Sequence, residues 1–191
     1  MEESRAKLAP TRRAQLRGMT LWELMFTLAV AATVIGLGVP SFRQFTLDAR
    51  RTADINAFVV AIQLARSEAA KRARSVIVCK TVDRVRCGGN DIDYDAGWMV
   101  FVNEDDVAPP ARSAAEPLLF AHEPRLEGSI ASNRPLYEFR AYRRRSTNGT
   151  VTFCDARGAG AARAVIVSYT GRPRTASVGP GNRPLVCAAL P

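Results

Sequence analysis

Near its N-terminus the chain contains 21 consecutive residues of which only one is charged. Residues 19–39 read MTLWELMFTLAVAATVIGLGV. At a rise of about 1.5 Å per residue, a helix of this length is roughly 30 Å long, which is enough to cross a bilayer. Because Arg12, Arg13 and Arg17 precede this stretch, we expect one membrane-spanning helix with the chain after Pro40 on the far side of the membrane.

The single charge in this stretch is Glu23. A carboxylate costs about 2.5 kcal/mol or more at the bilayer centre unless it is paired, which makes Glu23 a candidate for function. The alternative is that Glu23 lies close enough to the membrane edge to be hydrated. A secretory signal cleaved near Gly36 or Gly38 is a second interpretation of the whole stretch, although its length and Glu23 favour a membrane helix.

The residues around Gly18 resemble the class III signal of type IV pilins and type II secretion pseudopilins, in which a basic leader ends in Gly and a T-L-x-E-L run follows. The resemblance implies cleavage between Gly18 and Met19 by a prepilin peptidase and N-methylation of Met19. It also implies that Glu23 neutralises the terminal amine of a neighbouring subunit, since paired charges remove each other's desolvation penalty. Met19 replaces the usual Phe, and Trp22 stands where a smaller aliphatic residue is common.

The same family commonly has a proline near the position of Pro40, where the assembly helix bends or melts. We therefore expect a cleaved leader at 1–18, a membrane and assembly helix at 19–39, an amphipathic helical half at 40–74 and a β-rich head at 75–191. The resemblance implies a single-pass protein of the bacterial inner membrane. Its head would be periplasmic, or extracellular in an assembled pilus.

Apolar residues at spacings of three and four continue the helix beyond Pro40, from Phe42 to Ala69. Polar residues of this segment, including Arg51 and Arg66, are expected on the opposite, solvent-facing side. The later part of the chain predicts strands at residues 75–80, 97–102, 117–121, 136–142, 149–154, 163–169 and 185–188.

The predicted fold class is α+β, with a long N-terminal helix packed on an antiparallel β-sheet in the manner of type IV pilins. Several segments resemble the GspH/FimT family of minor pilins and pseudopilins more narrowly. They are Ala65-Arg66-Ser67-Glu68-Ala69, Val76 to Cys79, Gly97 to Phe101, Phe153 to Gly158 and Ala164 to Ser168.

All four cysteines, Cys79, Cys87, Cys154 and Cys187, follow the apolar stretch. An even number fits two disulfides in an oxidising compartment, and three pairings are possible. We favour Cys79 with Cys87 and Cys154 with Cys187, because each pair falls in one neighbourhood of the strand pattern. No C-x-x-C is present and His122 is the only histidine, so neither a metal site nor another cofactor is expected.

The sequence contains no recognisable catalytic constellation, and we do not expect an enzyme. His122 has no nucleophile motif near it, which favours a structural or surface histidine. Asp91, Asp93 and Asp95 alternate like part of a calcium loop, but the Gly and distal Glu of an EF-hand are not in register. A solvated acidic turn is the preferred interpretation, with weak calcium binding as the alternative.

Charge is distributed unevenly along the chain. Residues 125–191 contain 11 arginines and three acidic residues, whereas residues 19–123 contain 11 basic and 13 acidic residues. Within the basic part lies Gly171-Arg172-Pro173-Arg174, in which Gly171 permits a turn and Pro173 stiffens the backbone between two permanent charges.

In the FimT branch of the family, a G-R-x-R motif in this region is associated with DNA binding during natural transformation, and Gly171, Arg172 and Arg174 match it. The contact would be electrostatic and without sequence specificity, to double-stranded DNA. A solvated basic hairpin is the alternative. Other arginines that could enlarge the surface are Arg143, Arg144, Arg145, Arg157, Arg163 and Arg183.

The leading hypothesis is a FimT-like minor pilin that assembles with other pilins and binds DNA for uptake. The alternative is a GspH-like pseudopilin of a type II secretion system, with a structural role and no DNA binding. A soluble secreted domain would require the interpretation of the N-terminus to be wrong.

The cleavage site is testable directly. Replacing Gly18→Val should block processing in cells that contain a prepilin peptidase, whereas Ala14→Val in the same leader should leave it intact. N-terminal sequencing of the processed protein should find Met19 first. Any other first residue, or normal processing of the Gly18 variant, contradicts the prepilin interpretation.

Overall fold

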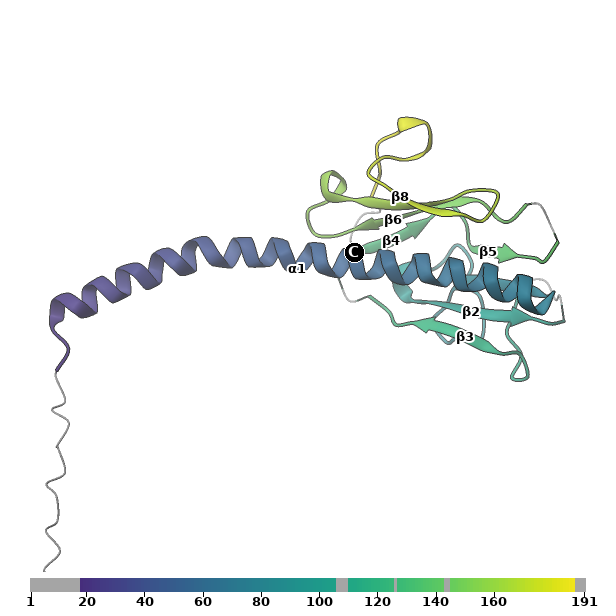
Figure 1. The fold of residues 1–191 in the computed structure, drawn as a ribbon, viewed down its shortest axis with the longest axis horizontal. Coiled ribbons are helices and arrows are strands. Elements are labelled where there is room, and N and C mark those ends of the chain that lie inside the picture. The colour runs from purple at the N-terminus through teal and green to yellow at the C-terminus, as the bar shows by residue number, and fades with distance from the viewer. Residues whose placement is uncertain (1–17, 106–109, 126, 143–144, 188–191) are drawn as a thin grey trace, which may run out of the picture. The chain divides into compact units, whose positions relative to one another are not determined.

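The computed structural model describes residues 18–105, 110–125, 127–142 and 145–187. Its longest element is helix α1 (Leu21–Arg72), whose 52 residues run through Pro40 without interruption. The chain forms two compact units that divide after Gln44. The second unit contains the rest of α1 and all the strands, and it is called the head below (Figure 1).

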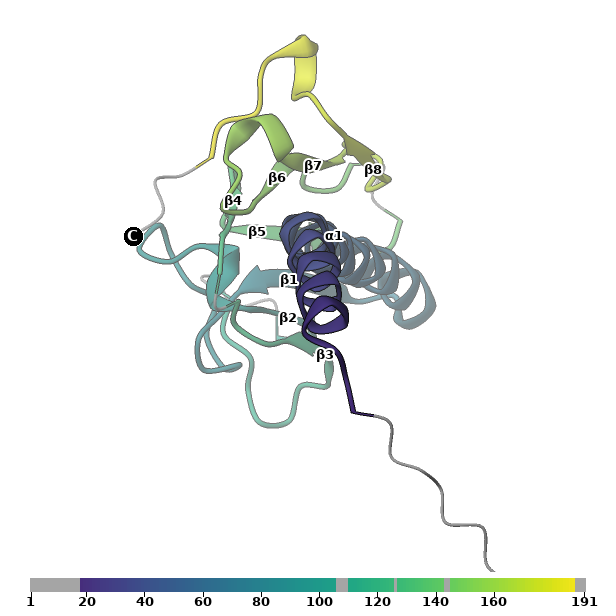
Figure 2. The ribbon, with the colours of Figure 1, turned by 90° about the vertical axis from the view of Figure 1, so that its left-hand side faces the viewer.

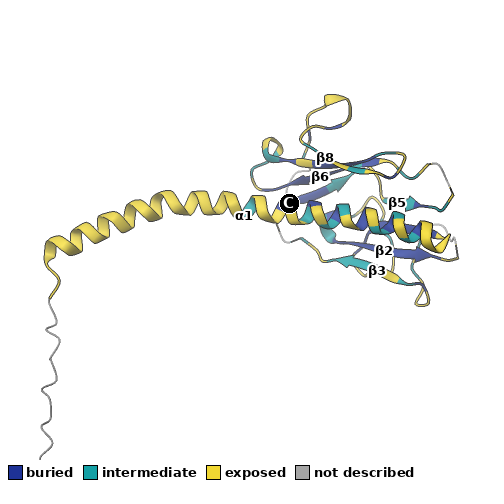
Figure 3. Ribbon diagram, in the orientation of Figure 1, coloured by how far each residue is buried: buried dark blue, intermediate teal, exposed yellow. Residues whose placement is uncertain are grey.

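The part of α1 that precedes the head is exposed on every side (Figure 3). Its exposed side chains include Leu21, Phe26 and Ile35, which are 77%, 64% and 62% exposed. By length and composition this is the one helix among the described residues that could cross a membrane. An apolar surface of this extent indicates lipid or other protein as its surroundings.

Among the described residues, eight strands form two antiparallel sheets in the head. The first sheet has the order β3-β2-β1-β5, and the second has the order β4-β6-β7-β8 (Figure 1). The strand bounds are β1 Ser75–Lys80, β2 Trp98–Asn103, β3 Leu118–His122, β4 Ser129–Ser132, β5 Leu136–Phe139, β6 Gly149–Cys154, β7 Arg163–Val167 and β8 Pro173–Ala176. Short 3-10 helices lie at Tyr94–Ala96, Ala159–Ala161 and Pro180–Asn182.

One apolar face of α1 joins the two sheets into one core. Within the head, the buried helical residues follow spacings of three and four, which place them on one side of the helix. Phe58 lies at their centre and makes edge contacts with rings from both sheets and from the Tyr94–Ala96 turn. Viewed along α1, the strands of both sheets lie beside the helix (Figure 2). The partners of Phe58 are Tyr94, Trp98, Tyr137 and Phe153, with ring centroids 5.7–6.1 Å away.

The face of the first sheet turned away from α1 is covered as well. Ile77, Cys79, Met99 and Phe101 form a second buried cluster there, and Cys87 packs on it. The Cys79–Cys87 disulfide holds the loop after β1 against this face, with a Cα–Cα distance of 5.5 Å. This explains why β1 is buried along its whole length.

The predicted fold class is confirmed, and so is the favoured pairing of the cysteines. Two strands were not expected. The β4 strand is short and contains small residues, and β8 begins with Pro173, which a sheet tolerates because β8 is an edge strand. The predicted strand at 185–188 is wrong over residues 185–187, which instead pack as irregular chain beside the Cys154–Cys187 disulfide.

Because Phe58 touches both sheets, its removal should weaken the whole head. We expect Phe58→Ala to lower the free energy of unfolding by about 3–5 kcal/mol. On the same helix Val60 is 52% exposed. Val60→Ala should therefore change the free energy of unfolding by less than about 0.5 kcal/mol. Denaturation of the full chain in detergent, followed by near-UV circular dichroism, measures both. Equal losses in the two variants would contradict this account of the core.

Candidate nucleic-acid interface

The predicted G-R-x-R motif lies at the end of the turn between β7 and β8 and includes the first two residues of β8. The Ser168 amide donates to the Arg172 carbonyl at 3.0 Å, and the Gly171 amide donates to the Ser168 carbonyl at 2.8 Å. The Arg172 amide also donates to the Ser168 hydroxyl at 3.2 Å. Gly171 has a φ of +74°, a conformation that other residues adopt at a cost of about 1–2 kcal/mol. The turn is therefore held by several hydrogen bonds and by a residue suited to it.

Gly171 is buried against neighbouring elements, although it lies in a turn. A Cβ atom at this position would come within 2.8 Å of Phe139 Cε1, 3.0 Å of Arg66 Cδ and 3.0 Å of Ser146 Oγ. The neighbouring loop is joined to the turn by a hydrogen bond of 2.7 Å from the Ser146 amide to the Tyr169 carbonyl. The hairpin end is thus seated on α1 and on the segment after β5.

Arg172 and Arg174 are both exposed and lie on the same face of the hairpin. Arg174 pairs with Ile166 across the ladder, and Arg172 lies opposite Ser168 through the backbone hydrogen bond described above. Since Ile166 and Ser168 are two residues apart in an extended segment, their opposing arginines share one side. No described residue forms an ion pair or a side-chain hydrogen bond with either guanidinium.

Two of the other arginines that the sequence suggested have partners within the described chain. Arg157 is engaged in ion pairs, and Arg163 donates from its NH1 to the Ala162 carbonyl at 2.9 Å. Arg183 lies in the loop that leaves the opposite end of β8. Arg145 is exposed, one residue before the Ser146 contact to the hairpin. Arg143 and Arg144 lie outside the described residues.

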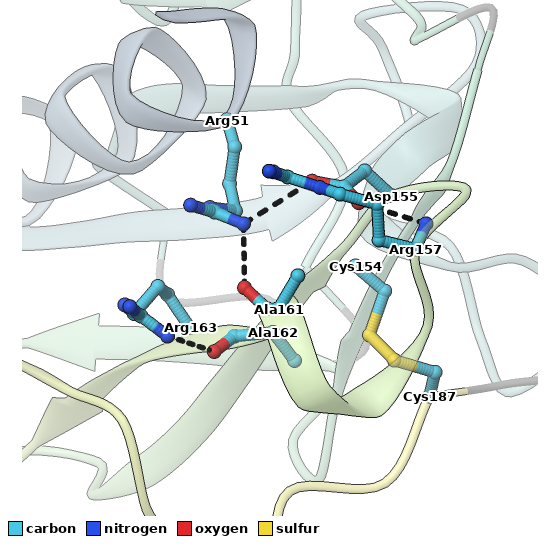
Figure 4. The surroundings of a disulfide bond; sticks show 8 residues. All are labelled: Arg51, Cys154, Asp155, Arg157, Ala161, Ala162, Arg163 and Cys187. Atoms are coloured by element: carbon cyan, nitrogen blue, oxygen red, sulfur yellow. Dashed lines mark hydrogen bonds and ion pairs between the residues drawn. A yellow bond between two sulfur atoms is a disulfide. The ribbon is translucent and has the colours of Figure 1, made fainter. Parts of the chain in front are cut away.

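Arg157 belongs to a network that joins α1 to the end of β6 (Figure 4). Its guanidinium binds Asp155 through two nitrogen–oxygen contacts of 2.9 and 2.7 Å, and Asp48 at 2.8 Å. Arg51, buried at 7% exposure, binds Asp155 at 3.2 Å and the Ala161 carbonyl. The expectation of a solvent-facing Arg51 is therefore wrong, because a buried carboxylate and a carbonyl compensate its charge.

Asp155 is the central anion of this network and is 2% exposed. Hydrogen bonds from Arg157 outweigh the effect of burial and hold the pKa of the Asp155 carboxyl below its usual range. The adjacent Cys154 is bonded to Cys187, with a Cα–Cα distance of 5.9 Å. The network and the disulfide together make this end of the head a structural region, not a free basic surface.

His122 also has a structural setting. Its ring stacks on Trp98 at 3.8 Å between centroids, and its Nε2 lies 3.7 Å from Asp54. Asp54 in turn pairs with Arg125 at 2.8 Å. Burial raises the pKa of the Asp54 carboxyl against the opposing effect of that arginine. Among the described residues, no group of three or more His, Cys, Asp or Glu side chains is placed to hold a metal ion.

At the N-terminal end, Thr20 precedes α1 and caps it. The Glu23 amide donates to the Thr20 hydroxyl at 3.3 Å, as expected of a Thr-x-x-Glu sequence at a helix start. Gly18 and Met19 are exposed just before this cap. The spacing of Thr20 and Glu23 could have predicted the helix start from the sequence alone.

Comparison with known proteins decides the family. The family model described as type II transport protein GspH matches residues 54–171, more than half of the chain. The chain belongs to the GspH family. It is therefore a minor type IV pilin or GspH-like pseudopilin, a structural protein that assembles with other pilins in a filament. No curated protein matches the chain.

Two crystal structures of the type IV minor pilin FimU from Pseudomonas aeruginosa strain PAO1 are similar to this chain. Both are 19% identical to it. One has a TM-score of 0.47 and covers 67% of this chain and 91% of FimU. The other has a TM-score of 0.49 and covers 69% of this chain and 92% of FimU.

The buried network predicts a defined pH dependence of stability. Since the pKa of Asp155 is lowered in the folded chain, its contribution is complete above the unfolded pKa of about 3.9 and is lost as pH falls through the lower folded value. Asp155→Asn should lower the free energy of unfolding by about 3 kcal/mol at pH 7, because it removes the buried carboxylate and leaves buried Arg51 with only the half-exposed Asp48 as an anionic partner. Denaturation at pH 7 and at pH 3 should show that the difference from wild type shrinks in acid.

Asp48→Asn is the matched control, since the Asp48 side chain contacts the same two arginines but is 52% exposed. It should destabilise the head far less than the Asp155 variant. A loss in Asp155→Asn that is the same at both pH values would contradict the assigned role of the carboxylate.

Proposed function

We propose that this GspH-family protein is a FimT-like minor pilin that binds double-stranded DNA during natural transformation. The observation that carries the proposal is the pair Arg172 and Arg174. Both are exposed, share one face of the hairpin and have no anionic partner among the described residues. Exposed guanidinium groups without an anionic partner suit phosphate oxygens, which they can bind with two hydrogen bonds each.

The geometry favours contact with the DNA backbone over contact with base edges. The arginines lie on a two-stranded edge in which β8 is the outermost strand, and Pro173 stiffens the backbone between them. Phosphate contacts of this type position a protein on DNA without reading its sequence. We therefore propose binding that depends strongly on salt concentration and little on the bases.

The N-terminal region supports the assembly role of the same proposal. After cleavage at Gly18 by a prepilin peptidase, N-methylated Met19 would begin a chain whose apolar helix lies in the inner membrane. The head would face the periplasm, and the cell exterior once the protein is in a pilus. Glu23, in the first turn of α1, would pair with the terminal amine of a neighbouring subunit, since both charges need compensation in an apolar environment. Pro40 would allow local bending of the helix in the filament.

A GspH-like pseudopilin of a type II secretion system is the second candidate, favoured by the description of the matching family. It predicts the same membrane helix and filament contacts but no affinity for DNA. Neighbouring genes for pilus assembly or for secretion would distinguish the two systems.

DNA binding by the hairpin is tested by replacing Arg172→Gln and Arg174→Gln together. The full chain in detergent is titrated with a fluorescent DNA duplex over a range of salt concentrations. Losing two phosphate contacts should flatten the slope of log affinity against log salt by about 1.8.

Arg183→Gln is the matched control, because it removes the same charge from the opposite end of β8. Its slope should equal that of the wild type. An unchanged slope in the double variant, or an equal change per residue in the control, would reject the hairpin as the site.

A further inference from the structure

Arg66 of α1 lies directly beneath the hairpin that carries Arg172 and Arg174. Its Cδ is 3.0 Å from the place that a Cβ of residue 171 would occupy, so glycine at residue 171 allows this approach without crowding. The Arg66 side chain is partly buried by the contact. Its guanidinium begins one bond beyond Cδ and therefore emerges close to the turn between Gly171 and Arg172.

The charge of Arg66 has no compensation within the described chain. Its neighbours one helical turn away are Ile62, Gln63, Ala69 and Ala70, none of them acidic. The nearby Glu68 is paired with Lys71 and Arg72. No described residue forms an ion pair or side-chain hydrogen bond with Arg66. A half-buried cation without an anion in the described chain can accept one from a ligand.

We propose that Arg66 is a third phosphate-binding residue of the hairpin site and that Gly171 keeps it beside Arg172. This inference rests on the proposed DNA binding and extends it to a residue outside the G-R-x-R motif. The site then draws on two elements, a rigid helix and the end of a β-hairpin. Its ligand is the phosphodiester backbone of DNA, which Arg66 would contact from the α1 side of the turn and Arg172 and Arg174 from the hairpin.

Gly171 has a specific role in this arrangement. A Cβ there would clash with Phe139 Cε1 at 2.8 Å and crowd Arg66 Cδ and Ser146 Oγ at 3.0 Å, so the turn or the Arg66 side chain would have to shift. Arg66, which reaches the turn from the α1 side, would be displaced from it, while Arg174, opposite Ile166 on the other face of the hairpin, would keep its place. Glycine in the motif thus serves the placement of charge as well as the left-handed turn.

Arg66→Gln is the decisive substitution, because glutamine keeps the carbon chain through Cδ and so preserves the packing beneath Gly171. In the duplex titration of the full chain in detergent, the slope of log affinity against log salt should flatten by about 0.9. Arg66→Lys, which keeps the charge, should retain the wild-type slope. Adding Arg66→Gln to the Arg172 and Arg174 double variant should flatten its slope by about a further 0.9.

The outcomes separate this inference from the function on which it rests. If Arg66→Gln matches the wild type while the double variant has a flatter slope, DNA binding by the hairpin stands and the role of Arg66 is overturned. If none of these variants changes the slope, both fail. Arg183→Gln again controls for the loss of one positive charge elsewhere on the head.

Gly171→Ala tests the positioning role while leaving every arginine in place. Circular dichroism should show a folded head, and the slope should flatten as it does in Arg66→Gln. A folded Gly171→Ala protein with the wild-type slope would overturn the role of Gly171. The Arg66 variants test the phosphate contact separately, whether or not the alanine variant folds.

Discussion

The contact of one helical face with two sheets is the interaction on which the head depends. Val76 and Val78 of the first sheet and Val151 and Val165 of the second belong to the same buried cluster as Phe58. A sheet with one apolar face must bury it against another element, and here a single helix does so for both sheets. Because both sheets pack on α1, the loops at their edges are positioned relative to this helix.

The class of fold was predictable because it depends on local patterns, and the disulfides because each cysteine pair falls in one neighbourhood of the predicted strands. Spacings of three and four gave the helix, and runs such as residues 149–154 gave the strands. The pattern was insufficient for β8, because Gly171 and Pro173 signal a turn and only pairing with β7 makes the following residues a strand. It also failed at Arg51, since amphipathic reasoning treats every arginine as solvent-facing, while Asp155 lies 104 positions away in the sequence.

The candidate site was predictable in part for the same reason. The G-R-x-R motif is contiguous, so Arg172 and Arg174 could be recognised without knowledge of the fold. Their common face follows from the β7–β8 register, which is a tertiary feature. Arg157 and Arg163 counted as basic residues in the sequence, but local contacts give them other roles. The charge distribution therefore identified the basic part of the sequence. Only the contacts in the structure show which of its described arginines have no anionic partner in the chain.

Arg51 and Arg66 show how one helix can use the same residue type in two ways. They are 15 residues apart in the sequence, about four helical turns, and so lie on the same flank of α1, toward the two ends of β7. At the first end the chain supplies an anion, Asp155, and the arginine stabilises the fold. At the second end Arg66 lies beside Gly171, but the described chain supplies no carboxylate. A partly buried guanidinium is stabilised by an anion in either setting, and under the proposed DNA binding a phosphate would supply that anion at the second end.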